Sequence, residues 1–369
     1  MDNIKIDDFN ELNRLNLYRM DFEVRRRIKR NWDALAKPLD GLGNFERAIC
    51  DIGGIQRSDR PSIAKRAVVV MCSDNGIVEE GISQTGKEAT LAVAKALGQR
   101  TSSACRFAAL ANADVFPIDV GVDCEEMIPG VQNSKIARGT KNFAKEPAMT
   151  EEQTLGAVKV GIEAVGKLFE QGYNLLVAGE MGIGNTTTSA AVLAALAQQP
   201  AENVVGPGAG LDSERLAHKL EVVKNAIEKY DLYYRKADYK ETWQFCLRIL
   251  TCVGGFDIAA LAGLYIGGML YGIPVLIDGF VSATAAFVAQ FLAREPVNSG
   301  VATNLGREPG CAVALDALLL TPIYNANVSF GEGVGAIMTI PTLDMALDYY
   351  LNGAKFEDLK LDPYKRFKK

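Results

Sequence analysis

A glycine-rich segment, Gly179–Thr188, offers the clearest chemistry in the sequence. It reads GEMGIGNTTT and stands between the apolar run NLLVAG and an alanine-rich stretch, so we expect it to connect a strand to a helix. Gly182 and Gly184 let the backbone turn tightly beside a ligand, while Asn185 and Thr186 add polar donors at the start of the helix, which attracts anions. The segment therefore fits a phosphate. A tight connection capped by a threonine explains the local pattern equally well.

Two glutamates stand beside glycines in a way that suits acid–base chemistry. Glu332 lies between Gly331 and Gly333, which leave its carboxylate room to turn into a cleft, and Glu180 directly follows NLLVAG. Burial at such a place raises the pKa of a carboxylic acid and suits it to act as a general base. The alternative for both residues is a solvent-exposed glutamate in a turn, and the local pattern alone favours that alternative.

Other polar residues close further apolar runs. Asp74 and Asn75 follow VVVMCS, and Asp278 follows PVLI. Aspartates at such places bind ribose hydroxyls or metals, or cap the next helix. Lys219 lies on an expected charged helix after the glycine run 206–210, where it either pairs with a phosphate or is only solvated. That run lacks the third glycine of a dinucleotide-binding fingerprint.

Composition excludes several classes of protein. The 369 residues are 48% apolar and 23% charged, which is ordinary for a globular protein, and the net charge of -5 provides no basic field for nucleic acid. The seven cysteines lack the short paired spacings of zinc sites or disulfide frameworks. The start of the chain lacks a signal-peptide pattern. We therefore expect a cytoplasmic protein without a metal site, and the single histidine, His218, excludes a mechanism with two imidazoles.

Residues 258–277 carry no charge over a length that can span a membrane. Glycines and Pro274 interrupt the segment, and aspartates border it at Asp257 and Asp278. We therefore predict a buried small-residue helix followed by the short strand PVLI, and no membrane association.

The elements that must position these residues follow an alternating pattern. From about Lys65, short β-branched runs alternate with alanine-rich helical stretches, which is typical of parallel strands joined by helices. We predict an α/β fold with a Rossmann-like open parallel sheet, helices on both faces, and a ligand site at the carboxyl ends of the strands. The final strand is expected at GAIMTI, residues 335–340.

Eight segments together resemble the nicotinate-nucleotide:dimethylbenzimidazole phosphoribosyltransferase family, whose members make α-ribazole phosphate for cobalamin. In chain order they are PLDGLGNFE, SDNGIVEEGIS, IDVGVD, GEMGIGNTTT, VGPGAGLD, VGGFDIAALAGLYIGG, PVLIDGFVSATAA and GEGVGA. The resemblance extends from about residue 20 to about residue 350. Several long motifs in family order are far more specific than any single glycine-rich loop.

The resemblance implies an organisation and a set of partners. By this resemblance we expect residues 1–60 and 341–369 to form the two parts of a small helical domain and residues 61–340 to form the large catalytic domain. The expected substrates are nicotinate mononucleotide and an aromatic base, and no cofactor or metal is expected. The expected assembly is a homodimer, or a heterodimer with a paralogue.

The resemblance also implies roles for single residues. Glu332 matches the family's base, which takes the proton from the azole nitrogen of the acceptor, and Glu180 matches the acidic residue near it. The glycine-rich segment matches the loop that receives the ribose phosphate, which Lys219 would neutralise. The predicted substrate-binding residues are Asp74, Asn75, Thr85, Gly182, Gly184, Asn185, Thr186, Lys219, Asp278, Gly331 and Gly333.

Departures from the family pattern bear on the acceptor. Better-known members have histidine at the position of Asn75, a serine-proline pair at Thr85 and Gly86, and in some cases a glutamine at Val93. The resemblance therefore supports the reaction more firmly than it supports dimethylbenzimidazole, and adenine or phenolic acceptors stay open. Two other readings also stay open: a nicotinamide-dependent oxidoreductase, suggested by the run GPGAG, and a catalytically silent partner subunit.

Overall fold

A computed structural model describes residues 6, 8–12, 14–233 and 242–367 and contains one six-stranded parallel sheet. The strand order is β3-β2-β1-β4-β5-β6, which is the order of dinucleotide-binding folds and reverses direction between β1 and β4. The strands are β1 (Arg66–Ser73), β2 (Asp114–Gly121), β3 (Gln132–Asn133), β4 (Leu175–Met181), β5 (Val275–Ile277) and β6 (Gly300–Ala302).

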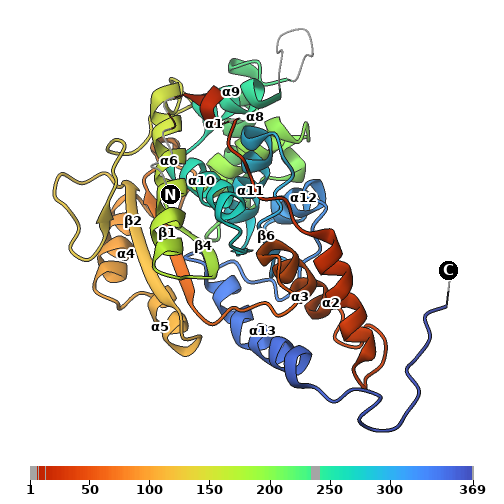
Figure 1. The fold of residues 1–369 in the computed structure, drawn as a ribbon. Helices are drawn as coiled ribbons and strands as arrows, with labels where there is room; N and C mark the ends of the chain where they lie inside the picture. The colour runs from red at the N-terminus through yellow and green to blue at the C-terminus, as the bar shows by residue number, and fades with distance from the viewer. Residues whose placement is uncertain (1–5, 7, 13, 234–241, 368–369) are drawn as a thin grey trace.

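Helices connect the strands and cover the sheet (Figure 1). They are α1 (Phe9–Leu12), α2 (Phe22–Ala34), α3 (Asn44–Gln56), α4 (Glu88–Gly98), α5 (Ser103–Leu110), α6 (Glu151–Glu170), α7 (Asn185–Leu196), α8 (Ser213–Lys229), α9 (Thr242–Val253), α10 (Phe256–Tyr271), α11 (Phe280–Ala293), α12 (Pro309–Ala317) and α13 (Val334–Asn352). Two 3-10 turns, η1 (Gly76–Glu80) and η2 (Ala201–Asn203), follow β1 and α7.

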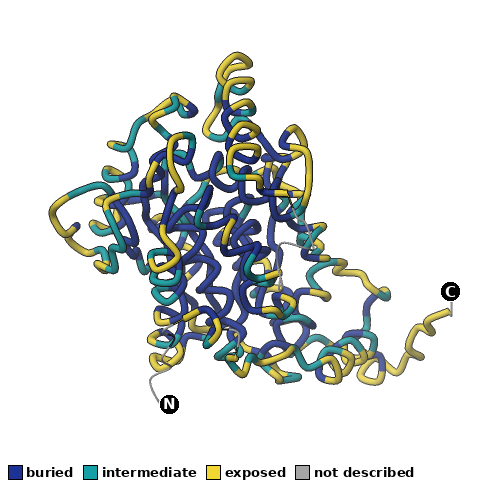
Figure 2. Tube along the Cα trace, turned by 90° about the horizontal axis from the view of Figure 1, so that it is seen from above, coloured by how far each residue is buried: buried dark blue, intermediate teal, exposed yellow. Residues whose placement is uncertain are grey.

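The sheet is buried on both faces. Along β1 the odd-numbered residues 67–71 belong to one apolar cluster and the even-numbered residues 68–72 to another, because successive side chains of a strand point to opposite faces. The first cluster includes residues of α6, α7, α10 and α11, and the second includes residues of α2, α3, α5 and α13. Figure 2 shows this buried interior under a largely exposed rim. The predicted parallel sheet with helices on both faces is therefore confirmed.

The uncharged segment 258–277 forms most of α10 and then β5, as predicted. None of the described helices is long and apolar enough to cross a membrane. The strand expected at residues 335–340 is wrong, because those residues open α13. Buried positions 336, 340, 343 and 347 recur every three or four residues, which is a helical period. Pro341 had hidden that period, although the helix accommodates it.

Helices α2 and α13, from opposite parts of the chain, pack together on one side of the sheet, whereas α1 packs on the other side. The rings of Trp32 in α2 and Tyr350 in α13 are 5.0 Å apart between centroids, and Asn31 donates to the Tyr350 hydroxyl at 2.9 Å. Helix α13 runs through residue 341 without a break. The division into a small domain (1–60 and 341–369) and a large domain (61–340) stays a prediction.

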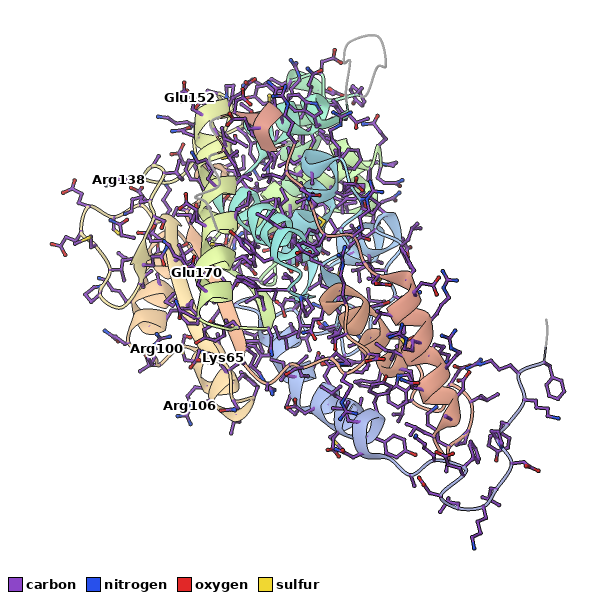
Figure 3. The ribbon with its side chains drawn as sticks, viewed as in Figure 1. Lys65, Arg100, Arg106, Arg138, Glu152 and Glu170 are labelled. Atoms are coloured by element: carbon purple, nitrogen blue, oxygen red, sulfur yellow. The ribbon has the colours of Figure 1, made fainter. Side chains whose placement is uncertain are left out.

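Helices α6 and α10 cross at close range beneath the sheet. A Cβ atom on Gly263 would lie 1.9 Å from the carbonyl oxygen of Val158, and one on Gly161 would lie 2.0 Å from that of Ala260. Glu152 and Glu170 near the two ends of α6 point outward (Figure 3). The helix therefore turns its charged face to solvent and its small residues to α10, whose first turn carries Asp257.

Replacing the glycine at this crossing should destabilise the protein. We expect Gly263→Ala to lower the free energy of unfolding by roughly 1–3 kcal/mol, because the facing group is backbone that cannot move aside. Gly156→Ala, also in α6, is the control. There the new Cβ would meet only the end of the Ile136 side chain at 3.2 Å, and helix propensity favours alanine by up to about 1 kcal/mol. Urea unfolding measures the free energy of unfolding of both variants. Equal values for Gly263→Ala and Gly156→Ala would contradict the close contact between α6 and α10.

Candidate active site

A cavity opens at the carboxyl ends of β4 and β5, where an open α/β sheet binds ligands. We call it the main cavity. Its walls include the apolar side chains of Met181, Phe280, Val281, Val328 and Phe330. The structure brings together in these walls the following predicted residues: Glu180, Gly182, Asn185, Thr186, Asp278, Gly331 and Glu332.

A tight turn holds the two predicted acids together. The backbone N–H of Glu332 donates to the carbonyl oxygen of Glu180 at 3.0 Å. Gly331, Glu332 and Gly333 all have positive φ, at 83°, 56° and 83°. That conformation is unfavourable for a glutamate and typically costs about 1–3 kcal/mol. Such strain persists only where the surroundings enforce it, so the Glu332 backbone is an outlier at a candidate site.

The carboxylate of Glu332 lies against the first turn of α5. Its Oε2 accepts a hydrogen bond from the backbone N–H of Ala104 at 3.2 Å, and the residue is 7% exposed. The partial positive charge of a helix N-terminus attracts a carboxylate. The side chain is therefore held at the cavity wall by a neutral backbone donor.

Glu180 has a different environment. Burial raises the pKa of Glu180 to about 8, and the negative charges of nearby Asp257 and Asp278 add to this effect. The amide of Asn185, which donates to Glu180 Oε2, opposes the rise. Glu180 is consequently largely protonated at neutral pH, and Asn185 fixes its orientation.

Asp278 joins the end of β5 to the start of α13. Its Oδ1 accepts from the backbone N–H of Ala336 at 2.9 Å, and burial raises the pKa of Asp278 to about 6 despite this bond. The aspartate thus fixes the turn that carries Glu332 relative to the sheet.

A second cavity adjoins the main cavity at the start of α7. We call it the lysine cavity, and its walls come from residues 82–84, 182–186, 207–211 and Lys219. Lys219 is 1% exposed, and its ammonium group donates to Thr186 Oγ1 at 2.9 Å and to the Gly206 carbonyl oxygen at 3.0 Å. Burial lowers the pKa of Lys219 to about 8, and the charge of Glu308 opposes this. A buried cation beside a helix N-terminus is suited to a phosphate.

Four predicted residues line neither cavity. Asp74 Oδ2 accepts from the backbone N–H of Asp123 at 2.8 Å, and Asn75 is buried, with its Oδ1 accepting from the Thr188 hydroxyl at 3.3 Å. Asn75 lies beside the glycine-rich loop, whereas Asp74 faces the segment that follows β2. Thr85 is exposed. Gly333 is the N-cap of α13, and its contribution is the turn itself.

The structure adds residues that sequence reasoning missed. Asp257 is fully buried behind the loop; a Cβ on Gly182 would lie 2.8 Å from Asp257 Oδ2. Burial raises the pKa of Asp257 to about 6. The sequence feature that could have identified Asp257 is its position directly before the uncharged segment 258–277. Arg307 and Glu308 also line the main cavity, and no motif marked them.

No group of three histidine, cysteine, aspartate or glutamate side chains in the described part of the chain is arranged to hold a metal ion. The acids of the main cavity are held instead by backbone and amide donors. Such a set can accept a proton and can stabilise a positive centre beside it.

The chain matches the family model described as Phosphoribosyltransferase over residues 17–360. A relative from Clostridium acetobutylicum, named nicotinate-nucleotide--dimethylbenzimidazole phosphoribosyltransferase, is 39% identical over 349 residues, which cover 95% of this chain and 97% of the relative. One of the same name from Acetivibrio thermocellus is 40% identical over 337 residues, which cover 91% of this chain and 93% of the relative.

A crystal structure of the enzyme with that name from Thermus thermophilus matches with a TM-score of 0.84 at 33% identity, covering 94% of this chain and 100% of that one. The resemblance expected from the eight motif segments is confirmed over nearly the whole length. This chain therefore belongs to the nicotinate-nucleotide–dimethylbenzimidazole phosphoribosyltransferase family.

Proposed function

We propose that the protein transfers the phosphoribosyl group of nicotinate mononucleotide to an aromatic base in the assembly of the lower ligand of a cobamide. The products are nicotinate and an α-riboside 5'-phosphate. The observation that carries the proposal is the placement of Glu332 and Glu180 in one cavity that adjoins the pocket of Lys219. An acceptor base and a sugar phosphate can therefore be held side by side.

The chemistry needs a base and a rigid site rather than a metal. Nicotinate bound to ribose through a positively charged pyridinium nitrogen is already a good leaving group. Glu332 takes the proton from one ring nitrogen of the acceptor while the other ring nitrogen attacks C1' of the ribose. Attack on the face opposite the nicotinate inverts the β-linkage to the α-linkage. Lys219 and the start of α7 hold the phosphate, which aligns the two reactants.

The acceptor site lies along the apolar wall of the main cavity. Met181, Phe280 and Phe330 supply flat or flexible apolar surface, which suits an aromatic ring. Val93, where some relatives have glutamine, is half-buried against the core and lines neither cavity. We propose 5,6-dimethylbenzimidazole or a related benzimidazole as the acceptor, with adenine and phenols as alternatives.

The other two readings gain less support. A nicotinamide-dependent oxidoreductase needs its glycine fingerprint directly after a strand, whereas the run 206–210 follows the 3-10 turn η2. A silent subunit would have no use for the strained turn at Glu332.

We also propose a homodimer in the cytoplasm, with a heterodimer as the alternative. Exposed apolar side chains on two helices that pack together, Leu110 on α5 and Met338 and Met345 on α13, support an interface. Six of the seven cysteines are buried and all are free, which suits a reducing compartment.

A direct assay tests the proposed reaction. Purified protein with nicotinate mononucleotide and an equimolar mixture of dimethylbenzimidazole, benzimidazole, adenine and phenol should release nicotinate and form an α-riboside phosphate. We expect the benzimidazoles to be consumed first, because the cavity wall is mainly apolar. Chromatography with standards of each α-riboside measures the products. Nucleotide binding without turnover for any base would support the silent subunit instead.

Glu332→Gln tests the base. The amide can still accept from the Ala104 N–H but cannot take a proton, so we expect kcat to fall roughly a hundredfold to ten-thousandfold with little change in the Kd for nicotinate mononucleotide. Glu170→Gln, an exposed residue at the end of α6, is the matched control. Steady-state kinetics and calorimetry measure the two quantities, and wild-type turnover in Glu332→Gln would remove the assigned base.

Asp257→Asn tests the charge behind Glu180. The negative charge of Asp257 contributes to the raised pKa of Glu180. Because Asp257, with a pKa of about 6, is ionised where Glu180 titrates near 8, its removal should lower the pKa of Glu180. The limb of the pH–kcat profile that reports Glu180 should therefore move to lower pH, whichever form is active. Asp348→Asn, an exposed change, should leave the profile unmoved. An unshifted limb in Asp257→Asn would sink this coupling.

A further inference from the structure

The charges of the main cavity are unbalanced. Four described acids line it, Glu180, Asp278, Glu308 and Glu332, and Arg307 is the one lysine or arginine among its described lining residues. Lys219, the cation of the neighbouring cavity, is buried and donates hydrogen bonds to Thr186 and to the Gly206 carbonyl oxygen. Arg307 differs, because its side chain is exposed and makes no hydrogen bond or ion pair with the described residues.

The backbone that carries Arg307 is nevertheless fixed. The preceding Gly306 and the following Glu308 are both buried. Glu308 Oε1 accepts from the backbone N–H of Gly208 at 3.0 Å, and Pro309 begins α12 directly afterwards. Gly208 lines both cavities. Arg307 is thus held at the rim of the main cavity, on a loop anchored to the wall that the two cavities share.

Both cations act on the buried acid Glu308: burial raises its pKa, and the charges of Lys219 and Arg307 oppose that rise. Arg307 and Glu308 line the main cavity, and Lys219 lines the lysine cavity. A ligand that occupies both cavities therefore has a lysine in one and an arginine in the other.

The proposed donor carries two anionic groups, a phosphate at one end and the carboxylate of its pyridine ring at the other. The lysine cavity suits the phosphate, which leaves the ring carboxylate to enter a cavity that already contains four acids. Glu180 is largely protonated, but a further carboxylate beside the other acids is disfavoured unless a cation lies near it. The donor's second anion therefore needs a basic partner at this place.

We propose that Arg307 binds the ring carboxylate of the donor nucleotide and selects a pyridine carboxylic acid over the corresponding carboxamide. This inference rests on the proposed function for the identity of the donor. The planar guanidinium offers paired donors that match a carboxylate, and a neutral carboxamide gains much less from the same cation. Solvent at the rim screens the charge, so the contribution is moderate.

Binding measurements test this independently of turnover. We expect wild-type protein to bind nicotinate mononucleotide more tightly than nicotinamide mononucleotide. Arg307→Gln should raise the Kd for nicotinate mononucleotide roughly tenfold and change the Kd for nicotinamide mononucleotide by no more than about twofold. Arg307→Lys should restore part of the preference for the carboxylate nucleotide, because a lysine keeps the positive charge but lacks the paired donors of the guanidinium. Isothermal titration calorimetry measures each Kd, and the ratio of kcat/KM for the two donors is the kinetic counterpart.

Lys219→Met provides the matched control. Both nucleotides carry the same phosphate, so this variant should raise the Kd of both by a similar factor. The ratio of the two Kd values should stay unchanged. An unchanged ratio in Arg307→Gln, whether both donors weaken equally or neither does, would overturn the inference. If the wild-type protein shows no transfer to any base, the proposed function fails, but the calorimetric ratio still decides the role of Arg307.

Discussion

One backbone hydrogen bond organises the candidate site: the N–H of Glu332 donates to the carbonyl oxygen of Glu180. It joins the end of a central strand to the turn before the last helix, and so places two acids from distant parts of the chain in one cavity. The turn has three successive left-handed residues, whose strain must be offset elsewhere. Helix α13 supplies that offset, because its apolar face is buried under the sheet and Asp278 fixes its first turn.

Neutral dipoles, rather than cations, hold the acids of the main cavity. Glu332 has a helix N–H, Asp278 has another, and Glu180 has the Asn185 amide. Glu332 and Asp278 are therefore held in place by neutral donors, whereas Glu180 is largely protonated. Transfer of a ribosyl group from a pyridinium develops positive charge on C1' of the sugar, which such a preorganised field stabilises. In our proposal Lys219 and Arg307 bind the two anionic groups of the donor, away from the acids that stabilise the reacting carbon.

Apolar runs predicted the four strands β1, β2, β4 and β5 and the parallel α/β class, but not the edge strands β3 and β6, which are only two and three residues long. They failed at residues 335–340, where a β-branched run before Pro341 concealed a helix. For the site, glycine spacing identified the loop and the turn, since both depend on local backbone geometry. Asp257 and Arg307 were missed because their significance arises only from packing: one lies behind Gly182, and the other stands on a loop anchored through Gly208.

The strand order is that of dinucleotide-binding proteins, yet the loops at its reversal point are used differently. After β1, Asp74 and Asn75 are buried and accept hydrogen bonds from Asp123 and Thr188, and neither lines a cavity. After β4, Gly182 has no room for a side chain, because the Ser73 carbonyl oxygen and the Asp257 carboxylate lie beside it. Asp257 is itself set by α10, whose close crossing with α6 leaves little freedom. The fold therefore determines where the cavities lie, whereas the packing behind a single loop determines that their walls carry acids and a buried lysine rather than the features of a pyrophosphate site.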